Sequence, residues 1–340
     1  MANDSYHGVE DYSPIHLALR TSFASVTAIL SVVSNFICLV VLPHVTSIPE
    51  NNRYFLLSLT IADFGTGIAT LTYIAPAANA ERMYSDDLCV WVCFFLHLFP
   101  LLSIISLIYL TVDKYVAITK PLRYPQLITK RRVIGLIIFT WFICAISYAC
   151  LLIPGPPAFY SVSAATCVPG LFRNSDVFLY RTFFSGVCIV LLPLITITLI
   201  YIHLYRITRR QIREIQERYG PSQEHCNKKS ALHAEGRVIR IFAAITITYA
   251  IVWIPYFAVV TYRNFTLNTI PWLDFIGAWF VFSGSWCDAV ILAGMSPAFR
   301  KTAKRLLLDK CGFVRSIRTA PNTNSEVLTI STRNNNISES

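Results

Sequence analysis

Charged side chains are scarce in this sequence. Only 14% of its 340 residues are Asp, Glu, Lys or Arg, 54% are hydrophobic, and the mean hydropathy is +0.53. Residues 88–112 contain no charge at all, which gives 25 residues and about 37 Å of helix at 1.5 Å per residue. The hydrocarbon core of a bilayer is only about 30 Å thick. This composition excludes an ordinary soluble protein and predicts an integral membrane protein.

Acidic residues are too few to balance the basic ones, and the net charge is +10. Such an excess could indicate a nucleic-acid partner, but the positions of the basic residues indicate a membrane instead. Of the 29 Lys and Arg residues, 24 fall on the side of the chain that carries Lys114 and 5 on the other. Because basic residues gather on the cytoplasmic side of a membrane, we expect Lys114 inside, the N-terminus outside and no nucleic-acid partner.

A signal peptide is also missing. Residues 1–20 are polar and include Asp4, Glu10 and Asp11, so the first apolar helix must direct its own insertion. We expect residues 1–20 to form an extracellular tail with a glycosylation sequon at Asn3.

The ten cysteines include no C-x-x-C pair with the spacing of metal ligands. Most of them lie inside apolar runs, where a cysteine behaves as a small buried hydrophobic residue. Only Cys89 and Cys167 lie at the predicted outer, oxidising side, which predicts a disulfide between them.

Seven charge-poor segments are long enough to cross a bilayer. They are residues 21–43, 54–80, 88–112, 133–153, 182–205, 241–262 and 275–295. The sequence therefore predicts an all-α membrane protein, a bundle of seven transmembrane helices over residues 21–295. Residues 296–311 predict a short amphipathic eighth helix lying on the lipid bilayer, with Cys311 placed for a palmitoyl anchor. Residues 312–340 are polar and predict a disordered cytoplasmic tail.

The third of these segments ends in a distinctive series of residues. The segment begins near Cys89 and is followed by the triplet Asp113-Lys114-Tyr115. After the triplet comes the pattern Val-Ala-Ile-x-x-Pro-Leu-x-Tyr, which ends at Tyr124. A charged triplet alone could be a plain interfacial anchor. The whole series resembles the third helix of rhodopsin-like (class A) G-protein-coupled receptors, and the resemblance covers about residues 21–310. It implies a plasma-membrane receptor, not an enzyme, that binds an extracellular ligand and activates a heterotrimeric G protein.

The resemblance assigns the switch facing the G protein to Asp113, Lys114, Tyr115, Glu235 and Tyr201. The family usually has Arg where this chain has Lys114. Glu235 matches the acidic partner that locks the triplet at rest, and a Lys lock should be looser because ammonium has no planar fork. A merely solvated Glu235 is the alternative.

The seventh segment departs from the family motif Asn-Pro-x-x-Tyr and reads Asp288-Ala-Val-Ile-Leu. Without the proline the helix should be straighter. The missing tyrosine removes a hydroxyl that, in relatives, bridges through water to the position of Tyr201. The tail after Cys311 offers several Ser and Thr residues, which we expect to be phosphorylated and to recruit arrestin.

Two carboxylates lie in mid-membrane, Asp63 and Asp288. A charged group there is a candidate functional site, although it could simply hydrogen-bond one helix to another. By resemblance, Asp63, Ser103 and Ser285 line a sodium site, and two adjacent carboxylates require a shared proton or a cation such as sodium. A transporter, or an intramembrane aspartyl protease using the two Asp residues, is the alternative class. The protease sequence settings and the inverted repeats of transporters are missing.

Trp253 precedes Pro255 by two residues and resembles the toggle beneath the ligand pocket, with an aromatic packed at a kink as the alternative. By resemblance the pocket is lined by Leu96, His97, Pro100, Ser185, Ile189, Trp253, Tyr256, Phe257 and Phe282. This apolar, aromatic set predicts a small-molecule ligand.

Individual positions narrow the ligand class. Amine receptors carry Asp where this chain has Leu96, which disfavours a protonated amine. No Lys occurs between Lys229 and Lys301, which excludes a retinal Schiff base on the seventh segment. No cofactor is expected apart from the sodium ion. His97 could orient a ligand or be satisfied within the bundle.

Overall fold

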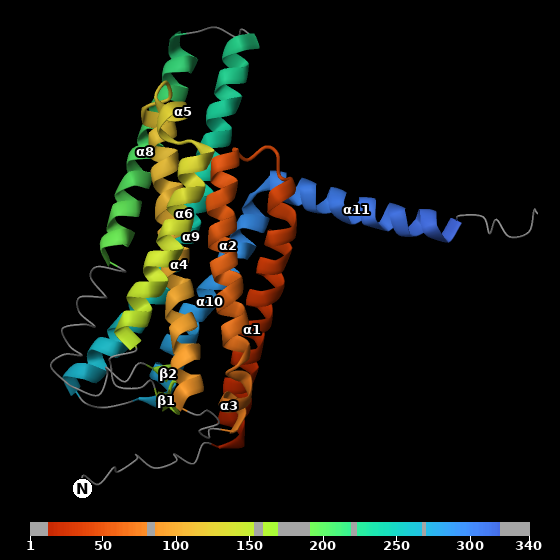
Figure 1. Cartoon of the computed structure of the whole chain (residues 1–340). Coiled ribbons are helices and arrows are strands. Elements are labelled where there is room, and N and C mark those ends of the chain that lie inside the picture. The colour runs from red at the N-terminus through yellow and green to blue at the C-terminus, as the bar shows by residue number, and fades with distance from the viewer. Residues whose placement is uncertain are drawn as a thin grey trace, which may run out of the picture.

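The computed structural model describes residues 13–79, 86–152, 159–168, 191–218, 223–266 and 270–319, and shows an elongated bundle of helices (Figure 1). Its elements in chain order are α1 (Pro14–Val41), the 3-10 helix η1 (Leu42–His44), α2 (Glu50–Leu71), α3 (Ile74–Asn79), α4 (Asp86–Thr119), α5 (Tyr124–Leu127), α6 (Lys130–Leu152), β1 (Phe159–Ser161), β2 (Thr166–Val168), α8 (Leu192–Arg218), α9 (Gln223–Thr266), α10 (Pro271–Met295) and α11 (Pro297–Thr319).

Six of the described helices are long and apolar enough to cross a membrane. The predicted fifth span, residues 182–205, is represented by α8, and its residues 182–190 lie outside the described part. The predicted all-α bundle is confirmed, apart from the small antiparallel β1–β2 hairpin, in which Tyr160 faces Cys167. We predicted the eighth helix over residues 296–311 and a disordered tail over residues 312–340, but α11 continues to Thr319. Residues 320–340 lie outside the described residues.

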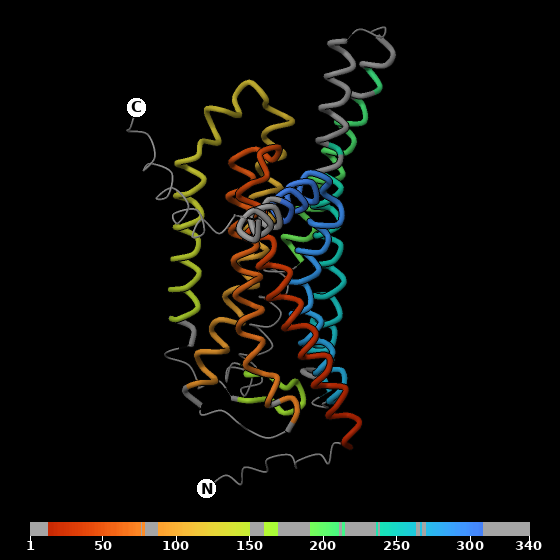
Figure 2. The backbone as a smooth tube through the Cα atoms, turned by 90° about the vertical axis from the view of Figure 1, so that its right-hand side faces the viewer, coloured from red at the N-terminus to blue at the C-terminus, as the bar shows by residue number. Residues whose placement is uncertain are grey.

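The two ends of the bundle differ in structure (Figure 2). We call the end with α5 and α11 the basic end, and the end with β1 and β2 the hairpin end. α4 lies centrally and packs against α2, α6, α8 and α9, while α1 packs against α2 and α10. At the basic end α8 and α9 continue past the other helices, and α11 leaves the bundle at a steep angle (Figure 1).

The first helix begins earlier than we expected. We predicted a tail over residues 1–20, but α1 starts at Pro14, where the Ser13 hydroxyl accepts a hydrogen bond from the His16 amide at 3.4 Å. The expected boundary was set by the charge of Arg20. That side chain is buried, with its guanidinium 5.1 Å from the Phe275 ring centroid. Its Nη2 also donates to the Val162 carbonyl. Because the ring and the carbonyl both stabilise the buried charge, the helix continues through Arg20.

The second helix ends earlier than we expected, at Leu71 rather than at residue 80, and a turn leads into α3. Thr70 and Thr72 donate their hydroxyls to the carbonyls of Gly67 and Ala69 at 2.8 and 2.7 Å. Such bonds compete with the helical ladder and favour an end to the helix.

α1 and α2 approach each other closely at Gly67. A Cβ atom there would lie 2.9 Å from the backbone nitrogen of Val32. Only glycine permits this contact, as in other membrane helices that pack backbone to backbone.

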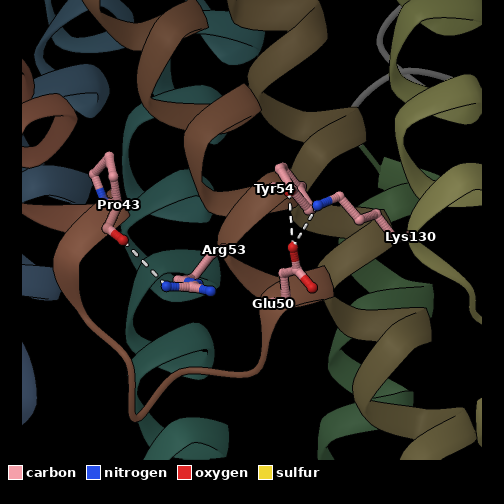
Figure 3. Close-up of polar contacts among 5 residues, drawn as sticks. All are labelled: Pro43, Glu50, Arg53, Tyr54 and Lys130. Carbon is pink, nitrogen blue, oxygen red and sulfur yellow. Dashed lines mark hydrogen bonds and ion pairs between the residues drawn. The ribbon is translucent and has the colours of Figure 1, made fainter.

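An ion pair joins α2 to α6 at the basic end (Figure 3). The Glu50 carboxylate accepts from Lys130 Nζ at 2.8 Å and from the Tyr54 hydroxyl at 3.0 Å. Nearby, Arg53 Nη1 donates to the Pro43 carbonyl at 3.1 Å. Both charged partners are about half exposed, so solvent screens the pair, and its main effect is to fix the start of α6 beside α2.

Candidate functional site

The Asp113-Lys114-Tyr115 triplet lies on the last turns of α4, at the basic end. Asp113 is 1% exposed and Lys114 3% exposed, so the bundle encloses both charges. Tyr124, in α5, donates its hydroxyl to Asp113 Oδ1 at 2.9 Å. A buried charge is costly unless it is paired and hydrogen-bonded, and this network meets that requirement.

Asn52, in the first turn of α2, connects the two charges. In the amide orientation that satisfies its neighbours, its nitrogen donates to Asp113 Oδ2 and its oxygen accepts from Lys114 Nζ at 3.0 Å. One neutral side chain thus contacts both buried charged groups. Three elements, α2, α4 and α5, hold the triplet in place.

Sequence reasoning missed Asn52 because it placed residues 46–52 in a loop. The helix begins at Glu50, which places Asn52 on the same buried face as Phe55, Leu56 and Leu59. The buried residues of this face recur every three or four positions, and extending that pattern by one turn toward the N-terminus would have identified Asn52.

The proposed partner Glu235 is part of α9, but its side chain lies outside the described residues. A Lys114–Glu235 lock therefore stays a prediction. Tyr201 of α8 is buried, and its hydroxyl lies 2.8 Å from the Thr111 hydroxyl of α4. This bond joins α4 and α8 within one turn of Asp113.

In mid-bundle, four predicted residues come together from three helices. The Asp63 carboxyl of α2 is 2% exposed and interacts with the hydroxyls of Ser103 from α4 and Ser285 from α10. Asp288, one turn along α10 from Ser285, is close enough for its charge to interact with Asp63. The Ser285 backbone carbonyl accepts from Asn35 Nδ2 of α1 at 2.9 Å.

This cluster suits a small hard cation. Its donors are all oxygen atoms, which is the set that such cations prefer. Asp63 Oδ2 is buried and has no hydrogen-bond partner among the described residues. No group of three or more His, Cys, Asp or Glu residues in the described part is arranged to hold a metal ion.

The candidate toggle Trp253 lies in α9 among other aromatic rings. Its ring centroid is 5.5 Å from that of Tyr249, 6.0 Å from Tyr256 and 5.9 Å from Phe257. Pro255 lies inside the same helix, two residues further on. A large indole next to a proline in a continuous helix is a side chain that a helix bend would move.

The remaining pocket residues divide into groups. Leu96 and Phe282 are buried in the core cluster at the hairpin end, and Pro100 is half-buried within α4. His97 Nδ1 lies 2.8 Å from the Cys93 carbonyl, and its ring stacks on Tyr148 of α6 at 5.6 Å. This is the arrangement of a histidine satisfied within the bundle. Ser185 and Ile189 lie outside the described residues, as does Asn3, and so does the side chain of Cys311.

The predicted disulfide between Cys89 and Cys167 is confirmed, with the two Cα atoms 5.5 Å apart. It ties the β1–β2 hairpin to α4. The hairpin also enters the bundle, because Ala164 and Ala165 are buried and Trp279 Nε1 of α10 donates to the Ala164 carbonyl at 3.2 Å. The hairpin therefore fills the space between α1, α2, α4 and α10 at this end.

Comparison with known proteins defines the class. Residues 34–291 match the family described as 7 transmembrane receptor (rhodopsin family). G-protein coupled receptor 52 of Bos taurus is 27% identical over 314 residues, 88% of this chain and 82% of the relative. Adenosine receptor A2a of Homo sapiens is 24% identical over 82% of this chain and 70% of the relative. Trace amine-associated receptor 9 of Rattus norvegicus is 25% identical over 91% of this chain and 92% of the relative.

The chain belongs to the rhodopsin family of seven-transmembrane receptors. It is therefore a multi-pass membrane protein and a receptor rather than an enzyme. This sets aside the intramembrane aspartyl protease.

Proposed function

We propose that this chain is a plasma-membrane receptor, with its N-terminus outside, that binds an extracellular ligand and activates a heterotrimeric G protein at its basic end. The observation that carries the proposal is the buried Asp113–Lys114 pair in a chain of this family. The orientation is supported by the 24 of 29 Lys and Arg residues on the side of Lys114.

The switch works by a change of partners. At rest, Asn52 and Tyr124 satisfy the charges of Asp113 and Lys114 inside the bundle. Activation separates the cytoplasmic ends of the helices, so that Lys114 leaves Asn52 and contacts the G protein. A ligand drives this change only as far as it binds the active arrangement more tightly than the resting one.

The ligand is a small molecule that binds on the α9 side of the bundle. The hairpin already fills the space between α1, α2, α4 and α10. The aromatic side chains Trp253, Tyr256 and Phe257 are half-buried on α9 and offer an apolar site with a few polar groups. A ligand there would act directly on the toggle.

Two of the relatives carry ligand classes in their names, adenosine and trace amines, and both are first compounds to test. Leu96 favours the neutral class, because it supplies no carboxylate to pair with a protonated amine. Arrestin remains a proposed partner through the tail beyond Cys311.

Sodium is proposed to occupy the mid-bundle cluster. Asp63, Ser103, Ser285 and Asp288 would hold it, and its single positive charge between the two carboxylates would reduce the repulsion that otherwise prevents both from staying ionised side by side. A cation bound there stabilises the arrangement of α2, α4 and α10 that brings these oxygens together.

The test is a ligand-library screen on membranes that contain the full-length chain and a promiscuous G protein, read as exchange of bound guanine nucleotide. A ligand that raises exchange supports the proposal. Solute flux in reconstituted vesicles without any nucleotide exchange would point to a transporter and overturn it.

A further inference from the structure

A groove runs between α8 and α9 at the basic end, with a cavity of about 910 Å³. Its cationic lining includes Arg206, Arg209 and Arg213 of α8 and Arg240 of α9. Its apolar lining includes Ile202 and Ile247, which are 44% and 60% exposed. A chain of this family presents such exposed apolar side chains to lipid, so the groove opens toward the membrane.

The spacing places the groove residues on one face of each helix. On α8, residues 202, 206, 209 and 213 are separated by four, three and four positions, and on α9 residues 240, 243 and 247 by three and four. The apolar and cationic halves thus lie in line along the helix axis rather than on opposite faces.

The change from apolar to cationic occurs at the same level on both helices. Residues 182–205 carry no charge and Arg206 is the next residue of α8. Residues 241–262 carry no charge and Arg240 directly precedes them on α9. Arg206 and Arg240 therefore mark the membrane boundary from both walls of the groove.

The charge of the lining is strongly positive. The groove holds five arginines against a single glutamate, and that glutamate, Glu214, already accepts from Arg210 Nε at 2.8 Å. The Arg209 guanidinium lies 5.8 Å from the Tyr205 ring centroid, which holds it along the groove wall. Guanidinium groups bind phosphate oxygens through paired hydrogen bonds.

We propose that this groove binds one anionic phospholipid with a phosphorylated headgroup. Its phosphodiester lies between Arg206 and Arg240, and one acyl chain follows Ile202 and Ile247 into the bilayer. From residue 206 to residue 213 the arginines extend over about 10 Å, more than one phosphate covers, so a headgroup with further phosphates fits best. The proposal rests on the proposed orientation, because anionic phospholipids concentrate in the cytoplasmic leaflet.

Lipid binding can be measured without ligand or G protein, so this test is separate from that of the proposed function. The full-length chain is released from mixed micelles and its bound lipids are counted by native mass spectrometry. The probes are phosphatidylinositol 4,5-bisphosphate, phosphatidylserine and phosphatidylcholine, and we expect affinity to fall in that order.

The variant Arg206→Gln/Arg240→Gln should weaken binding of the bisphosphate lipid about 30-fold, because each of the two lost charges contributes about 1 kcal/mol near the membrane surface. The matched control Lys301→Gln/Lys304→Gln removes two charges from exposed positions of α11 at the same end. It should change the affinity for the bisphosphate lipid less than about twofold. Arg206→Lys/Arg240→Lys keeps the charges, so partial binding by this variant supports the proposal even where the Gln variant folds poorly.

Three results would overturn the proposal. Equal losses in the groove variant and the α11 control would mean that surface charge alone attracts the lipid. Full competition by soluble inositol trisphosphate at equal concentration would assign the groove to a free anion. Unchanged lipid binding with reduced nucleotide exchange in the groove variant would assign it to the G protein.

Discussion

Replacing Asn52 should cost far more stability than its position in the first turn of a helix suggests. Its amide makes two hydrogen bonds to the buried charges of Asp113 and Lys114. A hydrogen bond to a charged group contributes about 1.5–3 kcal/mol, and the charges left behind cannot reach water. We therefore expect Asn52→Leu, which keeps the number and branching of the side-chain heavy atoms, to lower the free energy of unfolding by about 3 kcal/mol.

The neighbouring Asn51 provides a matched control. Its Nδ2 donates to the Ile128 carbonyl at 3.0 Å, a single neutral bond in a half-buried position. Asn51→Leu should cost only about 1 kcal/mol.

Thermal stability of the detergent-solubilised receptor, followed by loss of the monomer peak in size-exclusion chromatography, measures both variants. We expect the midpoint to fall by about 5–10 °C for Asn52→Leu and by about 2–4 °C for Asn51→Leu. In an Asp113→Asn background the effect of Asn52→Leu should shrink, because the two residues act on one network. Equal shifts for Asn51→Leu and Asn52→Leu would refute the reasoning.

Two further predictions concern the middle and the hairpin end of the bundle. Replacing N-methylglucamine by sodium at constant ionic strength should lower basal nucleotide exchange. Asp63→Asn should abolish this response, and Asp288→Asn should weaken it. A wild-type receptor whose basal exchange does not respond to sodium would contradict the ion site. Trp279→Phe removes the donor to the Ala164 carbonyl, so hydrogen exchange in the β1–β2 hairpin should rise by about fivefold, equivalent to about 1 kcal/mol. The control Trp272→Phe, whose indole is not part of that bond, should leave hairpin exchange unchanged.

The membrane-spanning helices and their order could be predicted from the sequence, because long charge-free runs have few alternatives in a membrane. The boundaries could not. Arg20 suggested the edge of the membrane, but it lies buried against Phe275 and Val162. The pairing of Cys89 with Cys167 was predictable, whereas the entry of Ala164 into the bundle depends on contacts with α10 that leave no local pattern.

Some residues of the candidate sites could likewise be predicted from the sequence, and others could not. Asp63 and Asp288 were predicted because charged groups are rare in apolar helices, and the resemblance to the family placed Ser103 and Ser285 beside Asp63. Asn52 was missed because residues 46–52 were expected to form a loop, whereas α2 begins at Glu50. Only the three-dimensional structure brings it to Asp113 and Lys114.

The most direct test of the proposed switch is guanine-nucleotide exchange by membranes that carry wild-type receptor, Lys114→Ala or Lys114→Arg at matched surface expression. We expect Lys114→Ala to abolish exchange on the partner G protein, and Lys114→Arg to preserve or raise it, because arginine adds a planar fork to the same charge. Exchange by Lys114→Ala equal to that of the wild type would contradict the assignment of the buried triplet as the switch.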